Sequence, residues 1–396
     1  MRGKRHYCTR GTIYVDRAPL QVKTGQNPVS VVQVNYAFDK GLTDPEQLLD
    51  RYHTLTGWSE ALRRAGAGRV AVVQQFHRDN RVTRNGIDYV FRRTDIPAAV
   101  AALGPDIAHV NGLTFPRQTL QLRRHLPRQT AIVVQNHQDG GPVGRAPLLR
   151  LLGRAARGAA DAFLFAAEEH AAWWRRAGLI AARQPAYCVM EASTTLRPQP
   201  RDEALRVTGL SGSPAILWVG RLNANKDPLT VLDGFERALT SLDAATLTMI
   251  FSEDDLLGAV KERVLRSNAL KDRVRLIGAV PHDRMASFYS AADLFTVGSH
   301  HEGSGYAVME ACACGTMPVV TGIPSFALLT GGGSIGALWE PGNAADCARA
   351  LVDAGRRDPI AERARIIDHF ARELSWDAVG RRAMEIYEQV LAGRRC

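Results

Sequence analysis

The sequence lacks the features that mark membrane-spanning, secreted or disulfide-stabilised proteins. No apolar run in its 396 residues approaches the roughly 18 that a transmembrane helix needs. The basic N-terminal stretch, residues 1–15, has no apolar segment of the kind found in a secretory signal peptide. Its six cysteines are scattered and form no C-x-x-C pair, so we expect small buried thiols in a reduced compartment. These absences predict a cytoplasmic protein.

Lysine is scarce, although the chain is basic. The formal net charge is +10, and 44 of the 50 basic residues are arginine. A basic surface can attract nucleic acid, anionic lipid or an anionic substrate. No zinc-ligand spacing, basic region with heptads or RNP-like aromatic strand accompanies the charge, so we expect no nucleic-acid partner. The arginine bias itself is more typical of genomic G+C content than of function.

What the chain has instead is a regular alternation of buried-strand and helical patterns. In the first half we expect strands at 29–35, 70–74, 88–91, 107–110, 131–135 and 162–166, and helices at 45–64, 98–103, 117–125, 148–158 and 168–177. In the second half we expect strands at 215–219, 246–251, 274–277, 294–297, from 318 and at 337–339, and helices at 228–239, 285–292, 306–314 and 377–391. Such alternation predicts parallel α/β sheets, and the length suggests two or three domains. Three prolines in 196–214 are typical of a linker.

The stretch 299–321, SHHEGSGYAVMEACACGTMPVVT, combines features of an anion site. A loop with Gly303 and Gly305 joins a buried strand to a short helix. Free N–H groups and the helix dipole favour negative charge at a helix N-terminus. Glu302 and Glu310 frame the loop, and carboxylates accept hydrogen bonds from hydroxyls. The stretch therefore predicts a ligand that carries both phosphate and sugar hydroxyls.

These residues resemble the donor-binding signature of retaining GT-B glycosyltransferases of the family 4 type. The resemblance lies in Ser299, in the E-G-x-G pattern at 302–305, and in the run from Glu310 to Pro318-Val319-Val320. Ser304 stands where that family usually has an aromatic residue, and Met317 adds one residue before the proline. The match is strong over 215–345 and weaker over 29–195.

The predicted strand at 215–219 ends in G-R-L-N-A-N-K-D, which is similar to the G-R-L…K-D pattern of the same family. Arg221 offers a planar fork of donors for phosphate oxygens, and Lys226 is a compact cation. Both could neutralise the charge that builds on a departing diphosphate. The alternative is a pair of surface cations in a loop.

Ligands of open parallel sheets bind at the carboxyl ends of the strands, and His137 follows such a strand. It matches a family histidine that faces the transferred sugar; the alternative is a loop histidine bonded to backbone. The glycine-rich turn that the family has after its first strand is not evident. The stretches 38–41 and 56–58 are candidate substitutes.

The resemblance implies a GT-B fold of class α/β, with two Rossmann-like domains whose parallel sheets face a central cleft. The expected division is an extension at 1–27, an acceptor domain at 28–205, a donor domain at 206–374, and a helix at 375–396 that crosses back to the first domain. It also implies retaining transfer of a sugar from a nucleotide-diphospho-sugar to an unidentified glycan, lipid-linked or small-molecule acceptor. No metal and no other cofactor is expected.

The resemblance also implies a role for each site residue. Arg221 and Lys226 would hold the diphosphate and stabilise the leaving group. Glu310 would bind the nucleotide ribose, Glu302 the sugar hydroxyls, and His137 the reacting sugar. The remaining donor-binding residues would be Gly220, Ile277, Gly303, Ser304, Gly305 and Tyr306.

Other interpretations remain open. The acidic stretch 252–255 is either a helix start capped by Ser252 or a metal site. The pair Trp173-Trp174 and the basic helix at 117–125 are either packed and solvated structure or a peripheral contact with anionic lipid at the inner membrane face. A GT-B-type epimerase or hydrolase and a non-catalytic nucleotide-sugar binding module share the expected fold. A Rossmann dehydrogenase is disfavoured, because no G-x-G-x-x-G follows the first strand.

Overall fold

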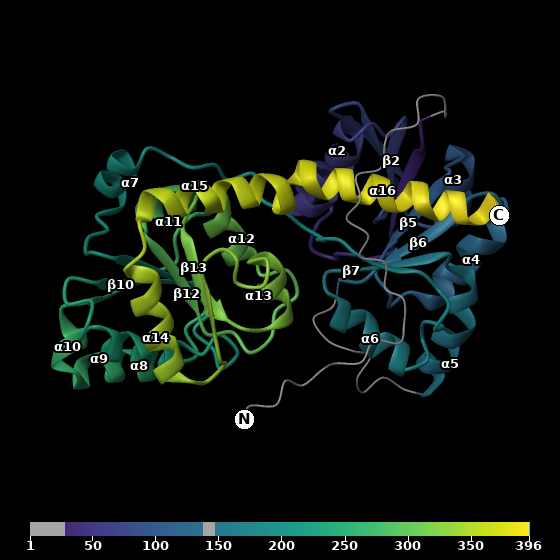
Figure 1. Cartoon of the computed structure of the whole chain (residues 1–396). Coiled ribbons are helices and arrows are strands. Elements are labelled where there is room, and N and C mark those ends of the chain that lie inside the picture. Colours follow the sequence, from purple (N-terminus) through teal and green to yellow (C-terminus); the bar gives the residue numbers. More distant parts are fainter. Residues whose placement is uncertain (1–27, 138–146, 396) are drawn as a thin grey trace. The chain divides into compact units, whose positions relative to one another are not determined.

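The computed structural model describes residues 28–137 and 147–395, which fold into two compact units (Figure 1). The first unit comprises the described residues up to Glu191 together with those from Val379 onward, and the second comprises Ala192–Ala378. The boundary expected at 205/206 thus falls inside the second unit. The expected N-terminal extension, residues 1–27, lies outside the described residues.

The first unit is built on an eight-stranded sheet in the order β3-β4-β2-β1-β5-β6-β7-β8. All pairs are parallel except β3–β4, a hairpin whose Asn85-Gly86 turn has positive φ at both residues; such a dipeptide is a common two-residue hairpin turn. The predicted strands are present, and β3 and β8 were not foreseen. The strands are β1 Ser30–Asn35, β2 Arg69–Gln75, β3 Asn80–Arg84, β4 Ile87–Arg92, β5 Ile107–Asn111, β6 Ala131–Gln135, β7 Ala162–Phe165 and β8 Ala186–Cys188.

The helices of this unit connect the parallel strands. The single helix expected at 45–64 is wrong, because the chain breaks at Tyr52, which leaves helical geometry and bonds Asp39 through its hydroxyl at 2.8 Å. The stretch 56–58 therefore lies within a helix and is not a glycine turn. The helices are α1 Pro45–Arg51, α2 His53–Arg64, α3 Ile96–Leu103, α4 Pro116–His125, α5 Pro147–Ala156, α6 Glu168–Arg176 and, after the second unit, α16 Trp376–Arg395, with a short 3₁₀ turn at Arg157–Ala159.

Alternating apolar residues of the central strands make the core of the first unit, where Val34, Val110 and Ile132 are fully buried. Trp174 joins this core and is 5% exposed, as the packed interpretation of the tryptophan pair expected. Contact with anionic lipid stays a prediction. No helix in the described part of the chain has the length and apolarity needed to cross a bilayer.

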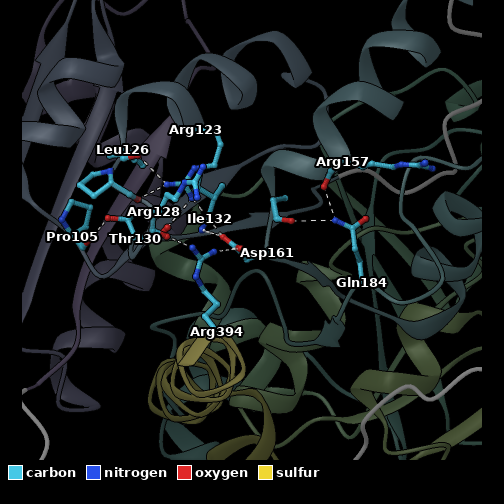
Figure 2. Close-up of polar contacts among 12 residues, drawn as sticks. Pro105, Arg123, Leu126, Arg128, Thr130, Ile132, Arg157, Asp161, Gln184 and Arg394 are labelled. Atoms are coloured by element: carbon cyan, nitrogen blue, oxygen red, sulfur yellow. Dashed lines mark hydrogen bonds and ion pairs between the residues drawn. The ribbon is translucent and has the colours of Figure 1, made fainter. Parts of the chain in front are cut away.

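Helix α16 is anchored to the first unit along its length. Gly380 lies against Ala61 of α2, and the Tyr387 hydroxyl lies 2.6 Å from Nδ1 of His109. At its end Arg394 pairs with Asp161, which also accepts from the Ile132 amide at 2.7 Å (Figure 2). The Arg123 guanidinium lies 3.8 Å from the same carboxylate. Residues far apart in the sequence thus fix the helix.

The second unit is a six-stranded parallel sheet in the order β11-β10-β9-β12-β13-β14. Its inner strands are mostly apolar, as expected where both faces of a sheet are covered by helices, whereas the edge strand β11 contains Arg275. The strands are β9 Ala215–Gly220, β10 Thr246–Phe251, β11 Val274–Gly278, β12 Leu294–Val297, β13 Met317–Thr321 and β14 Ala337–Trp339. Every strand predicted for this half is present.

The helices of the second unit correct two predictions. The linker expected at 196–214 contains α7, which packs on α11. Ser252 does not cap a helix, because α9 begins five residues later. The helices are α7 Arg201–Thr208, α8 Pro228–Ala238, α9 Leu257–Arg266, α10 Asn268–Lys271, α11 Met285–Ala291, α12 Tyr306–Ala313, α13 Pro324–Leu329, α14 Ala344–Gly355 and α15 Pro359–His369, with a 3₁₀ turn at His282–Arg284 and a π-turn at Phe370–Leu374.

Substitution of Gly380 tests the packing of α16 against α2. An added methyl group at Gly380 would overlap the carbonyl oxygen of Ala61 and lie 2.6 Å from its carbon. We expect Gly380→Ala to lower the free energy of unfolding by about 1–3 kcal/mol in urea melts, because the backbone must shift. Gly393→Ala on the same helix meets no atom within 4 Å and should be neutral or stabilising. Equal effects of the two changes on the free energy of unfolding would contradict the close packing of Gly380 against Ala61.

Acid should weaken the first unit through His109. Burial is the main cause that lowers the pKa of His109 from 6.5 to about 3, and His137 nearby lowers it further. The unfolded chain takes up a proton below about pH 6.5 and the fold does not, so stability should fall as the pH drops from there towards 3, by up to about 1.4 kcal/mol per pH unit.

The measurement is the unfolding free energy between about pH 7 and about pH 5, above the range in which ordinary carboxylates titrate. His109→Gln should flatten the pH dependence, because glutamine keeps a hydrogen-bonding group but has no proton to gain. His125→Gln, at an exposed position of α4, should leave the slope unchanged. A wild-type slope that persists in His109→Gln would refute the assignment.

Candidate functional site

In the second unit, the loops that follow β9 and β12 are joined by hydrogen bonds at the carboxyl ends of neighbouring strands. The backbone oxygen of Asn225 accepts from the His300 amide at 2.9 Å. Its side chain accepts from the His301 amide at 3.1 Å and donates to the His301 carbonyl at 3.0 Å. Asn225 therefore holds the G-R-L…K-D loop against the E-G-x-G loop. The residues that it joins, Asn225 and His301, are 76 positions apart in the sequence.

An ion pair between Lys226 and Glu302 lies at this junction. The two side chains are only 13% and 14% exposed. Ser299 donates to the same Glu302 oxygen at 2.7 Å, and the Lys226 backbone amide is held by the Asn223 side chain at 3.1 Å. Three residues singled out in the sequence, Ser299, Lys226 and Glu302, thus form one cluster.

The N-terminus of α12 opens beside this cluster. Gly305 is the N-cap residue, has φ 61° and supplies no side-chain cap. An added Cβ there would lie 2.8 Å from Leu329 and 2.9 Å from Phe326, so glycine is needed for both conformation and space. Tyr306, the first helical residue, is 44% exposed. Gly303 and Ser304 precede it in the same loop, so the predicted anion-binding backbone is a helix N-terminus.

Glu310 lies one turn into α12 and is 9% exposed. Its carboxylate accepts from the Tyr289 hydroxyl at 3.0 Å and lies 2.7 Å from Nε2 of His282. Burial, and next the neighbouring carboxylate, raise the pKa of Tyr289 well above its usual value, so the phenol stays protonated and donates. Tyr289 and His282 were not foreseen, although His282 follows the turn that ends β11. They fix the orientation of Glu310.

Three further residues predicted for the site differ in setting. Arg221 is half exposed and lies 3.8 Å from Glu253. Gly220 ends β9, and an added Cβ there would be 3.5 Å from the Lys226 side chain. Ile277 is the extra residue of a β-bulge, because Met249 pairs with Leu276 and Ile250 with Gly278. Bulges re-aim side chains next to binding sites.

The first unit contains a cavity of about 650 Å³ that the sequence analysis did not foresee, and all its lining residues belong to that unit. Its floor is a row of carboxamides in one register across β2, β1, β5 and β6: Gln74, Asn35, Asn111 and Gln135. Gln33 lies two residues before Asn35 and hence on the same face of the sheet. The sequence does contain a sign of this row, because each of the four strand segments, VQVN, VVQQ, HVN and VVQ, has Gln or Asn near its carboxyl end.

His137, assigned by resemblance to the reacting sugar, lines this cavity. Its Nδ1 lies 2.7 Å from Glu191, and its Nε2 lies 3.0 Å from the Asn111 side-chain oxygen. Asn111 in turn donates to Gln33 at 3.1 Å and Asn35 at 2.5 Å. The histidine is therefore oriented by a side-chain network and not only by backbone. The glycines at 140–141 that accompanied it in the sequence lie outside the described residues.

The loop after β1 forms the edge of the cavity. Asp39 accepts from the Tyr52 hydroxyl and from the Gly41 amide, both at 2.8 Å. These bonds, that from Tyr52 first, lower the pKa of Asp39. In the loop 38–41, considered as a substitute for a glycine turn, Phe38, Asp39 and Lys40 line the cavity of the first unit.

Within residues 28–137 and 147–395, no group of three or more His, Cys, Asp or Glu side chains is placed to hold a metal ion. The acidic stretch 252–255 follows β10, where the Glu253 carbonyl accepts from the Leu222 amide at 3.0 Å. Its role in the fold is thus to join the loops after β9 and β10.

A double-mutant cycle tests the Lys226–Glu302 pair. Removing one partner leaves a poorly hydrated charge, so Lys226→Ala or Glu302→Ala should each cost up to about 3 kcal/mol of unfolding free energy. The double variant should cost less than the two single changes together. Arg266 and Glu262 form an exposed pair in the same unit, whose cycle should give at most about 0.5 kcal/mol. Additive effects at Lys226 and Glu302 would show that the pair is not coupled.

The family described as "Glycosyl transferases group 1" matches residues 200–369. The GDP-mannose:cellobiosyl-diphosphopolyprenol alpha-mannosyltransferase of Xanthomonas campestris is 28% identical over 183 residues, which are 46% of this chain and 48% of that protein. The D-inositol 3-phosphate glycosyltransferase of Xylanimonas cellulosilytica is 30% identical over 218 residues, 52% of this chain and 51% of that protein. The matches span about half the length of these relatives.

Among solved structures, Anabaena Alr3699/HepE in complex with UDP and glucose is similar with a TM-score of 0.62 at 14% identity, over 91% of this chain and all of that one. At this identity the likeness concerns the fold, and it confirms the predicted α/β class with two Rossmann-like GT-B domains. The matched sequence segment contains the Lys226–Glu302 pair, the α12 N-terminus and Glu310. Residues 200–369 are therefore similar to the glycosyl transferases group 1 family.

Proposed function

We propose that the protein transfers a sugar from a nucleotide-diphospho-sugar to an acceptor, with retention of configuration and without a metal ion. The strongest support is the Lys226–Glu302 pair at the open N-terminus of α12. A cation, the backbone amides of a helix N-terminus and a carboxylate within one junction offer groups for a diphosphate and for sugar hydroxyls together.

The donor would bind in the second unit. Lys226 and the amides of the loop 303–306 would hold the diphosphate, and the half-exposed Arg221 would turn from Glu253 to a phosphate oxygen. Glu310, already oriented by Tyr289, keeps lone pairs with which to accept from ribose hydroxyls. Ile277, at the bulge of β11, would line the base pocket.

Glu302 would change partners when the donor binds. In the ligand-free arrangement its carboxylate is neutralised by Lys226 and accepts from Ser299. A diphosphate attracts the ammonium group, which leaves the carboxylate to accept from sugar hydroxyls. The same pair would therefore keep both charges compensated before and after binding.

Catalysis would consist of positioning and stabilisation of the leaving group. As the sugar–phosphate bond breaks, negative charge collects on the diphosphate, where Lys226, Arg221 and the helix N-terminus lie. Groups oriented beforehand need little reorganisation at that moment. His137, held by Glu191 and Asn111 in the first unit, would contact the reacting sugar.

A thermal-shift panel with UDP, GDP, ADP, their sugar conjugates and NAD tests donor binding. A ligand at about 100 times its Kd adds roughly 2.7 kcal/mol of stability, which is readily seen as a rise in Tm. We expect one nucleoside diphosphate to stabilise the protein and Glu310→Ala to remove that shift. The absence of any shift from a folded sample would refute the proposed donor.

Turnover tests the role of Lys226. Once a donor is known, Lys226→Ala should lower kcat by about 10²–10³-fold, the usual effect of removing one donor to a developing charge. Lys261→Ala, at an exposed position of α9 in the same unit, should leave kcat unchanged. Donor conversion by the purified protein alone, without an acceptor, would instead indicate an epimerase or hydrolase. Full turnover in Lys226→Ala would disprove the role.

A further inference from the structure

We propose that the cavity of the first unit binds the sugar acceptor and that this acceptor is an uncharged saccharide or polyol, not a phosphorylated one. The term "acceptor" rests on the proposed glycosyl transfer. The binding of a neutral saccharide can be tested whether or not that proposal holds. It is carried by the floor, the rim and the charge of the cavity.

The floor consists of groups that match hydroxyls. Asn35, Gln74, Asn111 and Gln135 form one row, and Gln33 lies beside it. A carboxamide both donates and accepts hydrogen bonds, as a hydroxyl does. The Gln74 amide already donates to the Ala37 and Gln75 carbonyls, and the Asn111 amide to Gln33 and Asn35. The groups left for a ligand are therefore fewer than the row as a whole.

Two of these amides have donors to spare. The side-chain nitrogens of Asn35 and Gln135 are buried and have no hydrogen-bond acceptor among the described residues. Asn35 is 6% exposed and Gln135 is 1% exposed. An unpaired buried N–H is unfavourable, and a hydroxyl bound in the cavity would satisfy it. The oxygen of Asn35 is already used by Asn111, so its free group is a donor.

The rim and walls of the cavity are aromatic. Phe38 and Tyr52 line it and are 42% and 41% exposed. Trp58 and Phe115 line it further in. Aromatic rings pack against apolar faces while polar groups bind elsewhere. The C–H faces of a sugar ring suit such surfaces, and its hydroxyls suit the floor.

The charge of the cavity disfavours a phosphate group. Its charged lining residues are Asp39 and Glu191, which are acidic, and Lys40, which is exposed, while His137 is engaged with Glu191. Arginine, the residue best suited to phosphate, supplies 44 of the 50 basic residues of the chain. No arginine is among the described residues that line the cavity. A dianion would meet two carboxylates and few cations there.

Binding of matched ligands to the full chain tests this proposal, for example by saturation-transfer NMR and calorimetry. The probes are glucose, mannose and myo-inositol, each beside its monophosphate, with cellobiose as a neutral disaccharide. We expect at least one neutral probe to bind, and to bind at least about tenfold more tightly than its phosphate ester, a difference of about 1.4 kcal/mol. A phosphate ester that binds more tightly than its neutral partner would overturn the proposal, as would no binding of any neutral probe at about 10 mM.

Variants locate the binding. Phe38→Ala removes an exposed ring at the rim, and Gln135→Met replaces a carboxamide of the floor by an apolar side chain of similar length. Each change should lower the affinity for the neutral probe by about tenfold. Leu151→Ala, on an exposed residue of the same unit, should not. The melting temperature of each variant shows whether it is folded, and Phe38→Ala, at the surface, should be. Unchanged affinity in Phe38→Ala and Gln135→Met would refute the cavity as the site.

The experiments can refute the donor proposal and the saccharide proposal separately. Saccharide binding that is lost in the rim and floor variants supports this inference even if no nucleoside diphosphate stabilises the protein, in which case the proposed transfer fails. A nucleoside diphosphate that binds through Glu310, in a protein whose cavity takes only phosphorylated probes, would support the transfer and overturn the neutral acceptor.

Discussion

The second unit depends on one interaction, the pairing of Lys226 with Glu302 at the junction of two loops. Asn225 joins the same loops through three hydrogen bonds, so the pair lies in a backbone that is already fixed. The ion pair satisfies two charges that are mostly shielded from water, and a bound diphosphate would offer the lysine a second partner. Under the proposed function, the same charges would therefore contribute both to stability and to donor binding.

Local pattern was enough to predict most of the fold and to single out the residues that meet at the Lys226–Glu302 junction. Mostly apolar runs gave every strand of the second sheet, and the glycine loop before Tyr306 gave a helix N-terminus. Lys226 was recognised in one motif and Ser299 and Glu302 in another, and their meeting follows from the neighbouring positions of β9 and β12. In a parallel sheet, loops at the carboxyl ends of adjacent strands must come together.

The features that could not be predicted depend on contacts across long sequence distances. The break at Tyr52 is stabilised by Asp39, which lies in another loop, so helical periodicity alone ran through it. The helix α7 was hidden by prolines on both sides of an ordinary helical segment. The carboxamide row appears only when four strands are placed in register, since each strand contributes one or two polar residues that look unremarkable alone. Tyr289 reaches Glu310 from a different helix.

Hydrogen–deuterium exchange with and without a bound nucleoside diphosphate tests the central claim most directly, because amides that bind phosphate or lie in an ordered loop exchange more slowly. We predict that the nucleotide protects the segments 220–227 and 299–306 of the second unit and leaves the strand ends around the carboxamide row of the first unit unchanged. Protection confined to that row, with unaltered exchange at 220–227 and 299–306, would contradict the account.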